Sequence, residues 1–206
     1  MPDRIVRYVL KPIVFAASLV PIVLLARDVA SRDLWTYPFN VITRTTGLWS
    51  LRFLCITVAI TPVRWVTGWH RIIRFRRMAG LFAFFYGTLH LAAYLVLDGV
   101  ARLSAVSVLT DALRPFFALG WFAFALMVPL AATSTAGMIR RMGGSRWQTL
   151  HRLVYPAAVA SVLHTYWPFR SAAPPYAVIL ALIFLLRLSR AAMPVFPVRR
   201  RGQSPA

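Results

Sequence analysis

Six long apolar runs, separated by short segments rich in arginine, proline or glycine, constrain the fold of this chain more than any other feature. A helix needs about 20 mainly apolar residues to cross a bilayer. Hydrophobic residues make up 59% of the 206 positions, above the roughly 45–50% of soluble domains. We therefore expect an all-α integral membrane protein with about six transmembrane helices in a single domain, 1–206. The predicted spans lie near 13–26, 48–63, 78–97, 116–132, 153–167 and 176–188.

The basic residues predict the orientation of these spans. When the loops are assigned alternately to the two sides, 17 of the 24 lysines and arginines fall on the side that carries both termini. Loops rich in lysine and arginine remain in the cytoplasm. We therefore expect both termini, including a basic tail at 194–206, to be cytoplasmic. The net charge of +19 then reflects membrane topology, and no nucleic-acid partner is expected.

Three of the four histidines lie in or beside predicted spans. His90 lies in the third span, while His151 and His164 lie at the two ends of the fifth; His70 is in a loop. Ionisable residues inside a bilayer are costly and usually mark function. One isolated histidine often only forms a hydrogen bond to a neighbouring helix. Three histidines, with no acidic residue inside any predicted span, favour metal ligation over a proton relay.

His90 and His164 are expected at the same depth in the membrane. His90 lies 12 residues beyond Met78 and His164 lies 11 beyond Leu153, on two spans that both start at the cytoplasmic side. At a rise of about 1.5 Å per residue, both lie roughly 16–18 Å in, toward the far side. Two level imidazoles on facing helices suit the axial positions of a six-coordinate haem. Because Cys55 is the only cysteine, that haem is held non-covalently.

His151 precedes His164 by 13 residues, about 20 Å along an ideal helix, so it cannot bind the same iron. Two interpretations of His151 stay open: a ligand of a second haem, or part of a flavin or quinone site. Arg52, one turn inside the second span, either pairs with a haem propionate or snorkels to the headgroups.

Two functions from other classes compete with electron transfer. A polytopic transporter would use the histidines as a proton relay, but such a pathway is expected to include acidic residues or broken helices. A purely structural membrane scaffold leaves the level pair of histidines unexplained.

Three pairs of segments carry a resemblance to a known family. They are Thr46–Trp49 with Thr61–Arg64, Arg76–Leu81 with Leu89–Leu91, and Thr133–Thr135 with Arg146–Tyr155. Together they resemble the MsrQ (YedZ) family, the haem-binding membrane subunits of the periplasmic methionine-sulfoxide reductase system. The resemblance extends from about Thr46 to Trp167 and is most specific in its last pair of segments.

The resemblance implies a minimal ferric-reductase-type transmembrane domain of the bacterial inner membrane that binds haem b, with FMN also associated. It implies that His90, His151 and His164 take the family's haem-linked positions. Electrons would come from quinol or a cytosolic flavin reductase and pass to a periplasmic molybdopterin-containing subunit, which reduces methionine sulfoxide in proteins. The loops at 27–44 and 98–114 would form the docking platform for that partner. Another b-type cytochrome, such as a ferric reductase-like protein, is the alternative.

Overall fold

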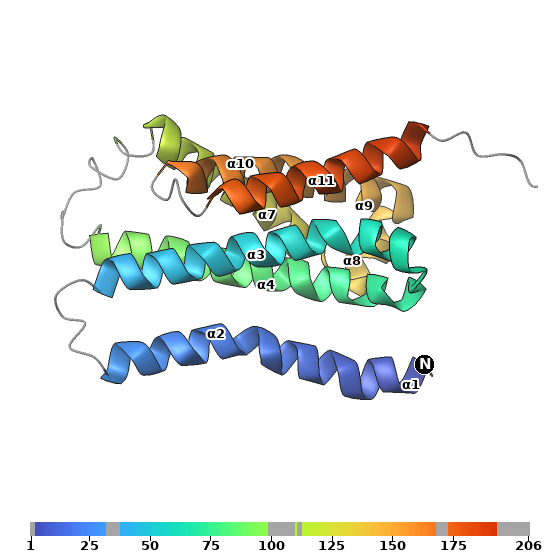
Figure 1. Ribbon diagram of the computed structural model, residues 1–206, viewed down its shortest axis with the longest axis horizontal. Helices are drawn as coiled ribbons and strands as arrows, with labels where there is room; N and C mark the ends of the chain where they lie inside the picture. The colour runs from blue at the N-terminus through green and yellow to red at the C-terminus, as the bar shows by residue number, and fades with distance from the viewer. Residues whose placement is uncertain (1–2, 32–37, 99–109, 111–112, 168–172, 193–206) are drawn as a thin grey trace, which may run out of the picture.

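The computed structural model describes residues 3–31, 38–98, 110, 113–167 and 173–192, and the regular elements among them are all helical. Six principal helices lie along one common direction, and each runs opposite to the one before it (Figure 1). They are α2 (Lys11–Ser31), α3 (Pro38–Thr67), α4 (Ile73–Ala93), α7 (Pro115–Ala132), α10 (Val154–Tyr166) and α11 (Ala173–Ala192). The protein is thus the all-α membrane protein that its apolar runs predict.

Short helical segments extend or connect these six helices. They are α1 (Asp3–Ile5), η1 (Val6–Leu10), η3 (His70–Ile72), η4 (Tyr94–Asp98), α8 (Ala136–Met142), α9 (Gly144–Leu150) and η5 (His151–Leu153). Gly143, with φ at +77°, separates α8 from α9, because a left-handed residue at this point ends one helix and redirects the chain. Pro156 lies in the first turn of α10, where its missing N–H costs no helical hydrogen bond.

Among the described residues, five segments are long and apolar enough to cross a membrane: Val6–Ser31, Phe39–Thr67, His70–Leu97, Pro115–Ala132 and Ala173–Arg190. The fifth predicted span corresponds to α10, which has 13 residues and falls short of the usual spanning length. Its buried side chains are mostly small, and Ala157 and Ala158 are fully buried. Small residues let helices approach closely, so this face of α10 packs tightly against the bundle, while Val159 and Leu163 on its other face are exposed.

The two ends of the bundle differ. The helix α2 begins and α11 ends at the same end, which also carries η3, α8 and α9 (Figure 1). We call this the basic end, because α8 carries Arg140 and Arg141 and α9 carries Arg146, and we call the opposite one the far end. An even number of passes agrees with the expectation that both termini lie on one side of the membrane. The predicted tail at 194–206 lies outside the described residues.

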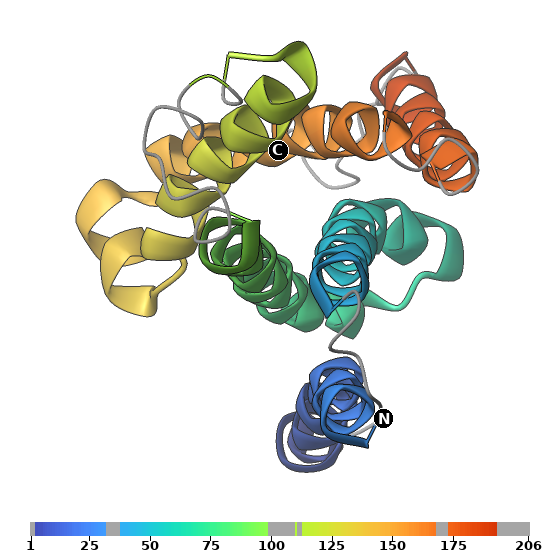
Figure 2. The same ribbon diagram turned by 90° about the vertical axis from the view of Figure 1, so that its left-hand side faces the viewer.

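Viewed along the helices, the bundle is built around the α3–α4 pair, which faces α7 and α10, while α11 flanks α3 and α10 (Figure 2). The helix α2 lies on the outer side of α3 and α4. A column of aromatic rings fills the α3–α4 interface, with Phe53 stacked on Tyr86 at 5.5 Å and on Phe82 at 5.5 Å between centroids. The hydroxyl of Tyr86 donates a hydrogen bond of 2.8 Å to the carbonyl oxygen of Ser18 on α2.

Tyr86→Phe tests how α2 is attached. The Tyr86 side chain is 1% exposed. Removing its hydroxyl therefore leaves the carbonyl oxygen of Ser18 on α2 without this hydrogen-bond donor. We expect the free energy of unfolding to fall by about 1 kcal/mol, typical of an interhelical hydrogen bond in a membrane protein. Denaturation by sodium dodecyl sulfate measures this change. Tyr8→Phe is the control, because Tyr8 is 67% exposed; equal losses in both variants would contradict the assignment.

Candidate functional site

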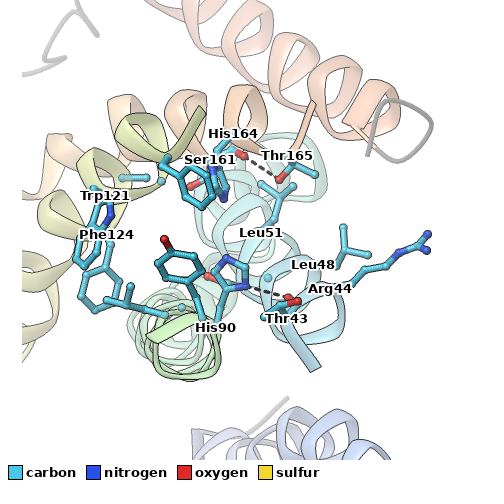
Figure 3. A pocket seen from close by; sticks show the side chains of 18 of the residues that line it. Thr43, Arg44, Leu48, Leu51, His90, Trp121, Phe124, Ser161, His164 and Thr165 are labelled. Atoms are coloured by element: carbon cyan, nitrogen blue, oxygen red, sulfur yellow. Dashed lines mark hydrogen bonds between the residues drawn. The ribbon is translucent and has the colours of Figure 1, made fainter. Parts of the chain in front are cut away.

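A cavity of about 330 Å³ opens between α3, α4, α7 and α10 at the far end of the bundle. His90 of α4 and His164 of α10 project into it from opposite sides (Figure 3). Their ring centroids lie 6.1 Å apart, and the ring planes make an angle of 77°. The structure therefore brings together the two histidines that helix geometry places at one depth.

The spacing of the two imidazoles fits one metal ion between them. An imidazole nitrogen binds a metal at about 2 Å, and half the ring adds about 1 Å, so two axial imidazoles on one metal have centroids about 6 Å apart. The observed separation is 6.1 Å. Much of the cavity wall is apolar, which suits a flat apolar macrocycle; examples are Leu48, Leu51, Phe117, Trp121, Phe124 and Met127.

Hydrogen bonds fix the same tautomer in both rings. Nδ1 of His90 lies 2.9 Å from the carbonyl oxygen of Thr43, and Nδ1 of His164 lies 2.9 Å from that of Phe116. Since a carbonyl oxygen only accepts, each Nδ1 carries the proton and donates it, and the tautomer follows from this network. The lone pair of each Nε2 is then available to a metal. Such second-shell hydrogen bonds are typical of ligating histidines.

Each ring also packs against a glycine one helical turn beyond its carbonyl partner. A Cβ atom at Gly47 would lie 2.9 Å from Nδ1 of His90, and one at Gly120 would lie 2.8 Å from Cε1 of His164. Neither distance is compatible with an unshifted ring. The pairs Thr43–Gly47 on α3 and Phe116–Gly120 on α7 therefore form two equivalent cradles, each with a carbonyl that accepts the Nδ1 proton and a gap that admits the ring.

Arg44 is the only charged residue among the described residues that line this cavity, and it extends outward at the rim (Figure 3). Arg52 does not line it. Its Nε donates a hydrogen bond of 2.9 Å to the hydroxyl of Tyr176, and its guanidinium lies 4.6 Å from the centre of the Trp49 ring. Arg52 thus links α3 to α11.

His151 lies elsewhere, in a second cavity of about 200 Å³ toward the basic end, together with Arg76 and Arg77. Met127 lines both cavities, so one side chain forms a common wall between them. The ring of Trp147 stacks on that of His151 with 3.8 Å between centroids. The structure therefore separates His151 from the other two histidines, as its place along the chain predicts.

The hydrogen bonds of His151 differ from those of the paired histidines. Its Nε2 lies 3.1 Å from the hydroxyl of Thr133, which itself lies 2.7 Å from the carbonyl oxygen of Pro129. The single hydroxyl proton points to that carbonyl, so Nε2 of His151 carries a proton and donates it. His151 precedes α10, and burial together with the charge of Arg76 lowers its pKa to about 4. The imidazole is therefore neutral at pH 7.

His70 lies in η3 at the basic end, exposed and outside both cavities. Sequence reasoning missed Gly47, Gly120 and Arg44 as site residues. The sequence did not indicate the two glycines as site residues. Each lies on a helix that faces a histidine-bearing helix, and the sequence of one helix does not show how it aligns with its neighbour.

Paired histidines, poised between helices with both Nε2 lone pairs available, define a polytopic membrane protein of the electron-transfer class. Comparison with known proteins agrees: residues 46–162 match the family described as ferric reductase like transmembrane component. The chain belongs to the MsrQ family, because relatives that bear that name are closely similar over most of their length.

Three of these relatives are each named protein-methionine-sulfoxide reductase heme-binding subunit MsrQ. The protein from Herminiimonas arsenicoxydans is 47% identical over 159 residues, which cover 77% of this chain and 72% of the relative. The Ralstonia nicotianae protein is 48% identical over 75% of this chain and 70% of its own. The Rhodospirillum rubrum protein is 44% identical over 94% of this chain and 92% of its own.

Proposed function

We propose that this chain holds haem b between His90 and His164 and carries electrons through the bacterial inner membrane to a periplasmic partner. The partner is a molybdopterin-containing subunit that reduces methionine sulfoxide in proteins. The observation that carries the haem site is the pair of imidazoles 6.1 Å apart, each with Nδ1 bound to a backbone carbonyl. The name of the relatives supports a methionine-sulfoxide reductase as the partner, and the family resemblance implies its molybdopterin.

The residues of the site each have a part in this function. His90 and His164 would bind iron through Nε2 from opposite faces, and haem bound in this way supplies reversible one-electron transfer. The carbonyls of Thr43 and Phe116 keep both rings in one orientation.

The distribution of charge supports the orientation of the protein in this proposal. The basic end would face the cytoplasm, which places the two paired histidines in the periplasmic half of the membrane. A soluble periplasmic subunit docked at the far end would then lie near the haem. Quinol or a cytosolic flavin reductase would supply the electrons, and FMN, which the family resemblance implies, would be a second cofactor.

Reoxidation of the reduced protein tests this function. The purified protein is reduced under anaerobic conditions and mixed with the purified molybdopterin-containing subunit and methionine sulfoxide. We expect the reduced haem absorption to decay only when both are present. The match to a ferric-reductase-like family makes ferric reduction the alternative, so a ferric chelate is tested in parallel. If the ferric chelate reoxidises the haem but the molybdopterin-containing subunit with methionine sulfoxide does not, the proposed partner is contradicted.

Arg44→Gln tests the polar rim of the cavity. With one arginine at the rim of a largely apolar cavity, a haem propionate would lie near Arg44. Removing this positive charge favours the more positive, oxidised iron, so we expect the reduction potential to fall by tens of millivolts. The low-spin spectrum should persist. Arg52→Gln is the matched control, since Arg52 bonds Tyr176 instead; an equal shift in both variants would contradict this role of Arg44.

A further inference from the structure

Phe116 contacts His164 in two ways, through its backbone and through its side chain. Its carbonyl oxygen lies 2.9 Å from Nδ1 of His164. Its aromatic ring lies nearly parallel to the imidazole, with 4.4 Å between centroids and 8° between planes. Pro115 occupies the start of α7, where proline favours the beginning of a helix, and Phe116 follows it. One residue in the first turn of α7 therefore contacts both an edge and a face of the imidazole.

The ring of Phe116 is itself held by further aromatic rings. Phe117 packs edge-on against it with 4.7 Å between centroids, and Tyr94 packs on Phe117 at 5.3 Å. Aromatic pairs prefer such spacings and tilted arrangements. Tyr94 lies one turn beyond His90, in the segment η4 that continues α4. A row of rings thus extends from His164 on α10, across α7, to the helix that carries His90.

His90 has no equivalent contact. Among the described residues, the only aromatic ring in contact with His90 is that of His164, at 6.1 Å between centroids and 77° between planes. The orientation of His90 depends on the hydrogen bond from its Nδ1 to Thr43 and on the space at Gly47. Both cradles therefore have a carbonyl and a glycine, and a stacked ring is added only at His164.

A stacked ring restricts an imidazole more closely than a hydrogen bond does. Hydrogen bonds tolerate departures of about 30° from linearity, so Nδ1 of His164 could keep its bond while the ring tilts. A tilt toward Phe116 would bring atoms of the two rings into overlap, and a tilt away from it would lose their dispersion contact. The ring of Phe116 therefore restricts the plane of His164, and with it the angle between the two imidazoles.

We propose that Phe116 is a positioning residue of the haem site, whose ring holds the plane of His164 crossed to that of His90. This inference rests on the proposed function. Axial ligands are one of the means by which a protein tunes haem iron. Two imidazoles in crossed planes interact with two different iron d orbitals and leave them close in energy, whereas parallel planes act on the same orbital and separate the two. The orientation of His164 thus sets an electronic property that electron paramagnetic resonance measures.

Phe116→Leu removes the ring and keeps the backbone carbonyl, so it separates the two contacts that Phe116 makes with His164. We expect the purified variant to keep low-spin haem, because both imidazoles remain, with an affinity about tenfold lower. The single resonance at large g value that crossed planes give should be lost. The rhombic signal of nearly parallel planes, with three resolved features, should replace it.

Two further variants test whether the ring is responsible. Phe116→Tyr retains an aromatic face against the imidazole, so it should keep the signal of the wild type. Phe122→Leu is the matched control, because it makes the same replacement on the same helix at a residue that is 51% exposed and does not line the cavity. It should leave the signal unchanged.

A folded, haem-loaded Phe116→Leu protein with the wild-type spectrum would overturn the proposal, and so would the rhombic signal in Phe116→Tyr. If circular dichroism shows that Phe116→Leu does not fold, Phe116→Met provides the same comparison with a more flexible apolar side chain. A wild-type protein without low-spin haem would refute the proposed function as well. Low-spin haem with a spectrum that does not depend on the Phe116 ring refutes only this inference.

Discussion

His90→Ala and His164→Ala are each expected to abolish the low-spin haem spectrum of the purified protein. Each imidazole would supply one of the two axial ligands, and the described residues that line the far-end cavity include no third histidine and no cysteine. Loss of a direct ligand costs more than the 10–100-fold in affinity typical of a second-shell change, so we expect haem retention to fall by more than about a hundredfold. Visible absorption and haem content per protein measure both effects.

His70→Ala is the matched control for these variants. His70 is exposed in η3 and outside both cavities, so its removal should leave the spectrum unchanged. Circular dichroism and elution as a single species in detergent show whether each variant still folds. A folded His90→Ala or His164→Ala protein with an unchanged low-spin spectrum would show that the axial ligands lie elsewhere.

Gly47→Ala and Gly120→Ala are expected to have the second largest effect, although they add only one methyl group. The new Cβ would lie 2.9 Å from the His90 ring or 2.8 Å from the His164 ring, so the ring must move. Movement stretches the hydrogen bond from Nδ1 to Thr43 or to Phe116, and the Nε2 lone pair turns away from the metal position. We expect haem affinity to fall by about tenfold to a hundredfold in each variant.

Gly144→Ala controls for the general cost of replacing a glycine. A Cβ at Gly144 meets no atom within 4 Å, so this variant should keep full haem occupancy. Haem titration of the apoprotein compares all three variants. If Gly47→Ala and Gly120→Ala bind haem as tightly as the wild type, the glycine cradles do not position the axial imidazoles.

Much of the fold was predictable because membrane insertion imposes a simple rule on the sequence. A span must be apolar over its whole length, and its boundaries are marked by arginines, so the apolar runs identify α2, α3, α4, α7 and α11 directly. The equal depth of His90 and His164 in the membrane was predictable as well, since a constant rise per residue converts position along a helix into depth. The 6.1 Å separation of their rings agrees with that calculation.

The lateral relations between helices were not predictable in this way. Which carbonyl receives the Nδ1 proton of His164, and which glycine admits its ring, depends on how α7 and α10 are rotated against each other. Hydrophobic periodicity does not fix that rotation when every face of a helix is apolar. Because helix rotation was not known from the sequence, the hydrogen bond between Arg52 and Tyr176 was not predicted. Arg44 was not expected among the site residues for the same reason.

The fifth span shows a different limit. Hydropathy does not show where the helix that contains 153–167 begins. In the structure α9 and the 3-10 segment η5 precede α10, so His151 lies in η5 and His164 lies in α10. The donor state of His151 depends on Thr133 and Pro129 of α7, which are distant in sequence. The sequence therefore left both interpretations of His151 open.

The electron paramagnetic resonance spectrum of the wild-type protein, purified after expression with ample haem supply, tests the central claim most directly. We expect a low-spin ferric signal typical of haem with two axial imidazoles, which His90 and His164 would supply. The ring planes at 77° predict that this signal has the form seen for strongly crossed imidazole planes. A colourless preparation, or a purely high-spin signal from haem with one open axial position, would contradict the account.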